Sequence, residues 1–271
     1  MRCHCCDNET HDLDFCDSFL NNELQMCNYC KHIQLKVLPS PYDLFKYYNG
    51  EYAEKRNNFI GSAYFDIMEK RGQAQFSLIK RYIQSPIKSA IDIGCGYGFL
   101  MDVFNKNKTS IYGIEFDIHA AEFCKKKGLD VIIIENEKDI KNILKPVQLV
   151  TMSHVLEHLV DFDETLELIR KASDYLFIEV PAYNNINELY DDQEGHIQFF
   201  NRDSLYQLLK KRGFNVINFD TYGPSLSFFY LKKFKKIRSF FHIFTDNYFF
   251  NLYEKPSKDG IWIRAVVESI R

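Results

Sequence analysis

The sequence has no surplus of positive charge and no long hydrophobic run. Its 271 residues carry a formal net charge of -3, whereas a general nucleic-acid binder usually has a basic surface, so we expect no nucleic-acid partner. No apolar run reaches the roughly 18 residues that a membrane-spanning helix needs, and the first residues, MRCHCCDNE, contain no apolar signal region. We therefore predict a cytoplasmic, globular protein, whose length suffices for one full core and one small appendage.

Cysteine is rare after residue 30 but concentrated before it. The pairs Cys3–Cys6 and Cys27–Cys30 each have C-x-x-C spacing. Each pair can turn two sulfurs toward one point, and together they can complete a tetrahedral zinc site, which with four protein ligands is structural rather than catalytic. The alternative is a set of free or redox-active thiols. We favour zinc bound by Cys3, Cys6, Cys27 and Cys30, although one of them could be replaced by a neighbour: Cys5, Cys16, His4 or His11.

A Pro-Ser-Pro break at residues 39–41 separates this zinc-binding module, residues 1–40, from the rest of the chain. Residues 41–86 are rich in tyrosine and predict a helical lead-in. From residue 87 to 271, strand-like and helix-like segments alternate, which indicates an α/β fold with a parallel sheet and helices on both faces. The expected strands are 89–93, 110–115, 130–134, 147–152, 175–180, 214–222 and 261–268, and the expected helices are 98–106, 117–127, 137–144, 161–173 and 203–212.

A helical insertion is expected at roughly residues 223–260, between the last two strands. Within it, residues 226–244 combine an apolar stripe at helical spacing with a basic opposite face. Such a basic amphipathic helix can lie on an anionic membrane, but a stripe of this kind more often packs on the domain that carries it. We therefore favour a packed helix over peripheral membrane contact.

The first expected strand, 89–93, runs into the glycine-rich stretch DIGCGYG at residues 92–98. A dinucleotide-binding turn would read G-x-G-x-x-G, but here the third glycine comes one position early. The next expected strand ends in Glu115, and a carboxylate at this position can accept hydrogen bonds from the hydroxyls of a ribose. Asp92 adds a negative charge, which suits a ligand with a cationic tail and repels a pyrophosphate. The pattern therefore predicts a site for a nucleoside that carries a cationic tail.

The stretch 92–98, followed by Gly113-Ile-Glu115 and by Ser153-His-Val-Leu-Glu-His158, resembles class I S-adenosylmethionine (SAM)-dependent methyltransferases over residues 87–269. The resemblance implies a Rossmann-like sheet of seven strands, mostly parallel with the last strand antiparallel, and SAM as cofactor. It implies that Glu115 holds the ribose and that Phe116 flanks the adenine. The residues that it places around the methionine part or the sulfonium are Asp92, Gly94, Cys95, Gly96, Tyr97, Gly98, Ser153 and His154. Tyr52, in the tyrosine-rich lead-in, could also reach the ligand.

Cysteine pairs ahead of such a domain resemble those of sugar C-methyltransferases of deoxysugar biosynthesis and related polysaccharide-modifying enzymes. By that resemblance His196 matches the last histidine of a Tyr…His-Glu-His stretch that acts at the sugar, whereas Glu194 stands at the first histidine and Gly195 at the glutamate. These departures weaken the case for 3-C-methylation of a keto sugar, so we favour methylation of an oxygen acceptor and keep sugar C-methylation as the alternative. We predict that His196 removes the acceptor's proton, because a neutral imidazole can accept a proton near pH 7, and that Glu194 orients it or serves instead.

Two other functions fit part of the sequence, and a third does not. A non-catalytic scaffold protein that binds SAM would need only the intact glycine loop and Glu115. His154, Glu157 and His158 fit the H-x-x-E-H pattern of zinc peptidases, in which both histidines share one helix face, but their place after the fourth strand of a nucleoside-binding sheet argues against this class. Methylation of a nucleic-acid base lacks its Asn/Asp-Pro-Pro-Tyr or catalytic-cysteine signature. We therefore expect a small-molecule or glycan acceptor as the partner, in capsule or surface-polysaccharide biosynthesis.

Overall fold

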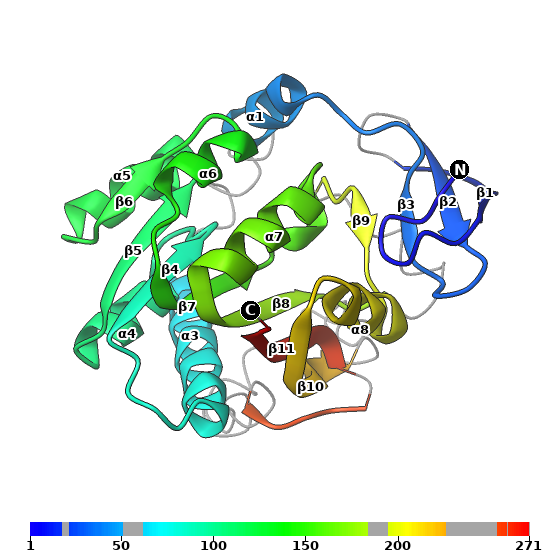
Figure 1. Ribbon diagram of the computed structural model, residues 1–271. Coiled ribbons are helices and arrows are strands. Elements are labelled where there is room, and N and C mark those ends of the chain that lie inside the picture. Colours follow the sequence, from blue (N-terminus) through cyan, green and yellow to red (C-terminus); the bar gives the residue numbers. More distant parts are fainter. Residues whose placement is uncertain (18–21, 51–61, 184–194, 226–253, 259, 271) are drawn as a thin grey trace, which may run out of the picture.

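The computed structural model describes residues 1–17, 22–50, 62–183, 195–225, 254–258 and 260–270. A four-stranded sheet near the N-terminus and a seven-stranded sheet in the main domain organise these residues (Figure 1). In chain order the elements are β1 (Thr10–Asp17), β2 (Asn22–Cys27), β3 (Ile33–Leu35), α1 (Pro41–Asn49), α3 (Ser62–Tyr82), β4 (Ser89–Ile93), α4 (Phe99–Lys106), β5 (Ser110–Glu115), α5 (Ile118–Lys126), β6 (Val131–Ile133), η1 (Glu137–Asp139), α6 (Ile140–Ile143), β7 (Val147–Ser153), η2 (Leu156–His158), α7 (Phe162–Ala172), β8 (Ser173–Pro181), β9 (Gln198–Phe199), α8 (Arg202–Lys211), β10 (Phe214–Ser225) and β11 (Gly260–Ser269).

The seven-stranded sheet has the order β10-β11-β8-β7-β4-β5-β6. The five neighbouring strands β8, β7, β4, β5 and β6 pair in parallel. Strand β11 runs antiparallel to both β8 and β10. The central strands are short apolar runs, which is the composition of a parallel sheet that helices cover on both faces. The predicted α/β fold, with a mostly parallel seven-stranded sheet and an antiparallel last strand, is confirmed.

Residues along the central strands alternate between two buried clusters, one on each face of the sheet. Ala90 packs with side chains of α3, α4 and α5, whereas Ile91 and Ile93 pack with side chains of α7 and α8. This alternation follows from the two-residue period of a strand. It leaves the carboxyl ends of β4, β5 and β7 at one edge of the sheet, where the loops that follow them meet.

The N-terminal sheet is completed from far along the chain. Strands β1, β2 and β3 form an antiparallel sheet, and β9 pairs with β3, so that Ile33 lies opposite Phe199 and Gln34 opposite Gln198. Figure 1 shows β9, in yellow, beside the blue N-terminal strands. The cysteines Cys3 and Cys27 belong to the same buried cluster as the inner faces of α7 and α8. The N-terminal strands and the main domain therefore share one core.

Side-chain caps fix where several helices begin. Ser40 forms a capping box with Asp43 at the start of α1, where Pro41 occupies the first turn. Asp117 accepts a hydrogen bond from the N–H of Ala120 at the start of α5. Such caps satisfy backbone N–H groups that have no partner within the helix. The start of α5 is thereby held directly behind Glu115.

None of the described helices is long and apolar enough to cross a membrane. The basic amphipathic helix predicted at 226–244 lies outside the described residues, as does most of the insertion predicted at 223–260. Strand β10 continues to Ser225, slightly beyond its predicted end.

Candidate active site and metal centre

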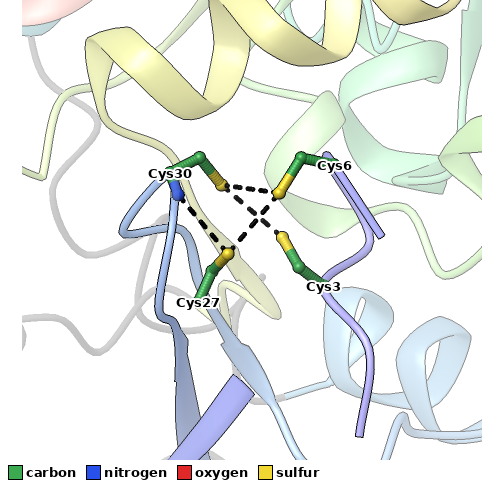
Figure 2. A group of neighbouring side chains, drawn as sticks. All are labelled: Cys3, Cys6, Cys27 and Cys30. Carbon is green, nitrogen blue, oxygen red and sulfur yellow. Dashed lines mark hydrogen bonds between the residues drawn. The ribbon is translucent and has the colours of Figure 1, made fainter. Parts of the chain in front are cut away.

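Four cysteine side chains from two separate segments point toward one another (Figure 2). Cys3 and Cys6 precede β1, whereas Cys27 and Cys30 flank the turn between β2 and β3. The Sγ atoms of Cys3 and Cys30 are 3.6 Å apart and those of Cys6 and Cys27 are 3.5 Å apart, and all four lie within 4.8 Å of one another. A disulfide needs a sulfur–sulfur distance of about 2.05 Å, so these four cysteines are thiols gathered around one point.

The geometry of this cluster fits a tetrahedral zinc ion. Zinc–sulfur bonds of about 2.3 Å give sulfur–sulfur edges of about 3.8 Å, close to the observed distances. The hydrogen bond between Cys3 and Cys30 lowers the pKa of the Cys3 thiol and raises that of Cys30. The backbone N–H groups of Tyr29 and Cys30 point at the Cys27 sulfur from 3.3 and 3.4 Å. These donors stabilise negative charge on sulfur, as a site for thiolate ligands requires.

The alternative ligands Cys5, His4 and His11 lie in different surroundings. Cys5 is buried beside the cluster, and burial raises the pKa of its thiol well above the usual value, which disfavours the thiolate form. His4 contacts the side chain of Gln198, and His11 contacts that of Asn28. The side chain of Cys16 lies outside the described residues.

The glycine-rich turn after β4 has the backbone of a ligand cradle. Gly94, Gly96 and Gly98 have φ angles of 67°, 53° and 73°, in the left-handed region that favours glycine. A Cβ atom added at Gly96 would meet no other atom within 4 Å, so the backbone there borders open space. At Gly94 an added Cβ would collide with Val155, because the loop after β7 packs against it. Gly96 is therefore the position of this turn at which a ligand can approach the backbone most closely.

Cys95 and Tyr97, between these glycines, turn their side chains into the protein. Cys95 is buried on the side of Gly113. The Tyr97 ring packs against Phe65 and Phe123, with centroids 5.9 and 5.2 Å away. These two residues border the cradle through their backbone.

Glu115 ties the end of β5 to the glycine-rich turn. One carboxylate oxygen accepts a hydrogen bond from the N–H of Gly96 at 2.6 Å, and the other accepts from the N–H groups of Phe116 and Asp117 at 2.8 Å. Asn49, the last residue of α1, donates to the carbonyl of Phe116 at 3.2 Å. The acid predicted to hold a ribose, and the residue predicted to flank an adenine, therefore lie beside the cradle at the ends of adjacent strands.

Asp92 lies beneath the same turn and is buried. Its carboxyl accepts a hydrogen bond from the Thr151 hydroxyl at 2.6 Å. Burial raises the pKa of Asp92 to about 7, and the nearby charge of Glu115 adds to the increase. Burial makes the ionised form of this carboxyl costly, and a nearby cation would offset that cost. The environment thus suits the role predicted for Asp92, beside the cationic part of a ligand.

The exit of β7 rests on a buried ionic network that the sequence did not reveal. Glu179 of β8 pairs with Arg71 of α3 and with Arg264 of β11. Arg71 also donates to the hydroxyl of Ser153 at 3.0 Å, and Gln75 donates to it at 2.8 Å. Although burial raises the pKa of Glu179, the charges of Arg264 and Arg71 hold it well below its usual range. This network fixes Ser153 at the edge of the sheet.

His154 follows Ser153 in a strained backbone conformation, with a φ of 57°. Its ring lies between two carboxylates, with Nδ1 3.4 Å from Glu157 and Nε2 3.5 Å from Glu179. Burial lowers the pKa of His154 to about 4, and the positive charge of Arg71 contributes. A non-glycine residue in this conformation often marks a functional site. His154 therefore enters the site as a neutral imidazole.

A second group of ionisable side chains lies next to His154. Glu157 and His158 of η2 meet His196, which precedes β9, and one ligand-type atom of each lies within 4.8 Å of the other two. The His158 and His196 rings have centroids 4.6 Å apart. Tyr48 contacts Nδ1 of His158 at 2.6 Å, and Tyr183 contacts Nδ1 of His196 at 2.7 Å. We call Glu157, His158 and His196 the His–Glu cluster.

The structure thus brings together residues predicted from separate stretches of sequence, with two exceptions. Tyr52 and Glu194 lie outside the described residues. The peptidase pattern is not realised as a helix face, because His154 lies outside the short η2 helix, and His158 faces His196 instead. Sequence reasoning missed residues that join the site from other segments: Tyr48, Asn49, Arg71, Tyr183 and Arg264. The one sequence signal was the tyrosine-rich composition of residues 41–86, which include Tyr48.

A glycine-rich turn and an acid at the ends of adjacent parallel strands, in a seven-stranded sheet with one reversed strand, define a class I methyltransferase fold. The comparison with known families agrees. The model of the methyltransferase domain family matches residues 59–218, more than half of the chain, so the chain belongs to this family. The comparison with curated proteins gave no match.

Solved structures of methyltransferases that are named for SAM, or that hold its product SAH, share the fold. A SAM-dependent methyltransferase from Archaeoglobus fulgidus is 20% identical with a TM-score of 0.53, and the match covers 73% of this chain and 94% of that one. Magnesium protoporphyrin IX methyltransferase from Synechocystis PCC 6803 with bound SAH is 11% identical with a TM-score of 0.56, covering 85% and 100%. The plantazolicin methyltransferase BamL, in complex with a triazolic desmethylPZN analog and SAH, is 14% identical with a TM-score of 0.57, covering 85% and 96%. Family and fold together support a SAM-dependent methyltransferase.

Proposed function

We propose that this protein transfers the methyl group of SAM to a hydroxyl oxygen of a sugar, or of a small decoration on a nucleotide-sugar or surface polysaccharide. The observation that carries the proposal is the position of His196. It lies in the His–Glu cluster, beside His154 at the end of β7, where the resemblance places the sulfonium of SAM. An acid–base residue is therefore available at the predicted point of transfer.

Bound SAM would supply an electrophilic methyl group on a positively charged sulfur. The acceptor oxygen attacks this methyl carbon; the carbon–oxygen bond forms as the carbon–sulfur bond breaks, and its electron pair stays on sulfur. The hydroxyl proton passes to Nε2 of His196, because Nδ1 already contacts Tyr183. Glu157, with Oε1 3.9 Å from that Nε2, stabilises the resulting imidazolium. Holding the two reactants in line supplies much of the acceleration, about 7–11 kcal/mol in favourable cases.

For the cofactor, the chain offers Glu115 to hold the ribose hydroxyls, the backbone of Gly96 to approach the methionine part, and Asp92 to face its cationic end. Phe116 flanks the adenine, and Ser153 and His154 border the sulfonium. The remaining predicted contacts are Gly94, Cys95, Tyr97, Gly98 and Tyr52. Support comes from the fit of the cradle: Gly96 borders open space, and Glu115 lies beside it.

The sugar acceptor rests on the resemblance of the cysteine module to that of sugar-modifying enzymes. The structural neighbours named above are a magnesium protoporphyrin IX methyltransferase and a plantazolicin methyltransferase, so the sugar acceptor rests on that resemblance and not on these neighbours. Four thiols gathered at one point support a structural zinc ion at Cys3, Cys6, Cys27 and Cys30, and they suit a reducing compartment such as the cytoplasm.

The test is a transfer assay with labelled SAM and a panel of nucleotide-sugars and cell-envelope precursors, read by label incorporation and by mass spectrometry of the product. We expect one acceptor to gain a methyl group with stoichiometric release of SAH. His196→Gln should reduce turnover by about 10²-fold or more, while SAM binding measured by calorimetry is unchanged. Tight SAM binding with no transfer to any member of the panel would favour the scaffold function instead.

A further inference from the structure

The His–Glu cluster has the composition of a metal site as well as that of an acid–base site. It combines a carboxylate and two imidazoles, one each from Glu157, His158 and His196, and their ligand-type atoms lie within 4.8 Å of one another. Glu157 and His196 are buried. The four-cysteine cluster is a separate group, built from residues 3–30.

We infer that Glu157, His158 and His196 bind a divalent transition-metal ion, in addition to any ion held by the four cysteines. Three atoms that lie within 4.8 Å of one another leave a central point no more than about 2.8 Å from each of them. Metal–nitrogen and metal–oxygen bonds of about 2.0–2.2 Å therefore require each side chain to move inward by less than about 1 Å. Small side-chain rotations suffice for this movement.

The two imidazoles are already oriented as metal ligands usually are. Tyr48 holds Nδ1 of His158 and Tyr183 holds Nδ1 of His196, at 2.6 and 2.7 Å. Histidines that bind a metal through one ring nitrogen usually make a hydrogen bond through the other, and this bond fixes the tautomer and the orientation of the ring. Tyr48 comes from α1 and Tyr183 from the residues just after β8, so two separate segments set the ring orientations.

Charge also favours a cation at this point. The side chain of Glu157 is fully buried, and its Oε1 lies 3.4 Å from Nδ1 of His154 and 3.9 Å from Nε2 of His196. A buried carboxylate is costly unless a cation or several hydrogen bonds compensate it. A divalent ion between Glu157 and the two imidazoles would supply that charge.

The ligand set selects the kind of ion and its role. Imidazole with one carboxylate suits zinc, manganese, iron or cobalt better than calcium or magnesium. Three protein ligands leave open positions, as in catalytic rather than structural sites. In a role that rests on the proposed function, the ion would bind the acceptor hydroxyl and lower its pKa. With this ion bound, His196 would serve as a ligand rather than as the base, and the hydroxyl proton would leave to solvent as the oxygen attacks the methyl carbon.

The experiment measures how many zinc ions each chain binds when zinc is the only metal added. Protein dialysed against zinc and then freed of excess is analysed for metal content by mass spectrometry. We expect about two zinc ions per chain, falling to about one in Glu157→Gln and in His158→Gln. The matched control is His119→Asn, which removes an exposed histidine of α5 and should leave the content at two. Circular dichroism and thermal melting verify that each variant is folded.

The two metal assignments are separated by a Cys27→Ser, Cys30→Ser double variant, which should lose one ion and keep the other. Cobalt gives an independent signature: thiolate-to-cobalt charge transfer reports the four-cysteine site, whereas the ion at the His–Glu cluster gives no such band. The inference is overturned if folded Glu157→Gln and His158→Gln bind as much zinc as the wild type. It is equally overturned if the wild type binds a single ion that the cysteine variant removes.

Discussion

Glu115 shows how a single residue organises the candidate cofactor site. One oxygen of its carboxylate accepts a hydrogen bond from the N–H of Gly96, and the other accepts from those of Phe116 and Asp117. Glu115 therefore connects the turn after β4 to the residues after β5. The sequence predicted its place because an acid ended the second strand of an alternating pattern. The sequence could not predict Arg71 or Arg264, because the network around Glu179 joins segments that no local pattern connects.

Replacing Glu115 with Gln should weaken SAM binding. The amide has the same shape but lacks the charge, and charge-assisted hydrogen bonds contribute about 1.5–3 kcal/mol, which corresponds to a roughly ten- to hundredfold loss of affinity. Isothermal titration with SAM measures the effect. Glu122→Gln, at an exposed position of α5, is the matched control and should bind like the wild type. Equal affinities of the two variants would remove Glu115 from the cofactor site.

Asp92 should make stability fall as pH rises. Burial raises its pKa in the folded protein to about 7 from a usual value of 3.8, so the folded state binds the proton more tightly than the unfolded state. The resulting stabilisation is fully present below about pH 4 and is lost as pH rises to about 7. Thermal melts of Asp92→Asn should lack this contribution, and the variant should exceed the wild type most above pH 7. Parallel pH profiles of the two proteins would contradict this account.

At the scale of elements, the main sheet follows from local pattern, whereas the N-terminal sheet does not. Predicted strands such as 147–152 and 175–180 match β7 and β8 closely, because a short apolar run is typical of a strand that is buried on both faces of a sheet. The predicted helix 137–144 is instead split into η1 and α6. Strand β9 has two residues, too few to give a period, and its partner β3 lies far away in sequence.

Gln198 of β9 should be important for joining the N-terminal sheet to the main domain. It is fully buried, and its Oε1 lies 2.9 Å from Nε2 of His32. Replacing it with Leu removes this hydrogen bond from the buried imidazole of His32, which costs about 1–3 kcal/mol. Chemical denaturation should show this loss, while Gln207→Leu, on the exposed face of α8, should change stability little. An undiminished midpoint for Gln198→Leu would show that the junction does not depend on this contact.

At the scale of the whole molecule, the cysteine module is part of the core. His32 packs against Phe200 with ring centroids 4.9 Å apart, and His4 packs against Phe162 at 6.2 Å. Asn201 donates to the carbonyl of Cys30 at 3.0 Å. Sequence composition suggested a boundary at residue 40, since the Pro-Ser-Pro break is a local signal, but side-chain packing across that boundary has no local signature.

Deleting residues 1–40 should therefore expose apolar surface and lower the soluble yield several-fold, because the inner faces of α7 and α8 lose their cover. The soluble fraction after expression and the SAM affinity of any recovered protein are the measurements. Tyr29→Ala, which removes an exposed ring of the same module (66% exposed), should leave the yield unchanged. A soluble, SAM-binding truncation would show that the main domain folds independently.

The position of β11 bears on how the protein is made. This strand is the last of the sheet in chain order, yet it lies between β8 and β10. A nascent chain on the ribosome that has not reached residue 260 leaves both of these strands with an unpaired edge, the feature that most readily recruits other chains. Arg264 also arrives with β11, so Glu179 lacks one of its two cationic partners until then. We therefore expect chains that terminate before β11 to aggregate and to be degraded by proteases more readily than the complete sheet.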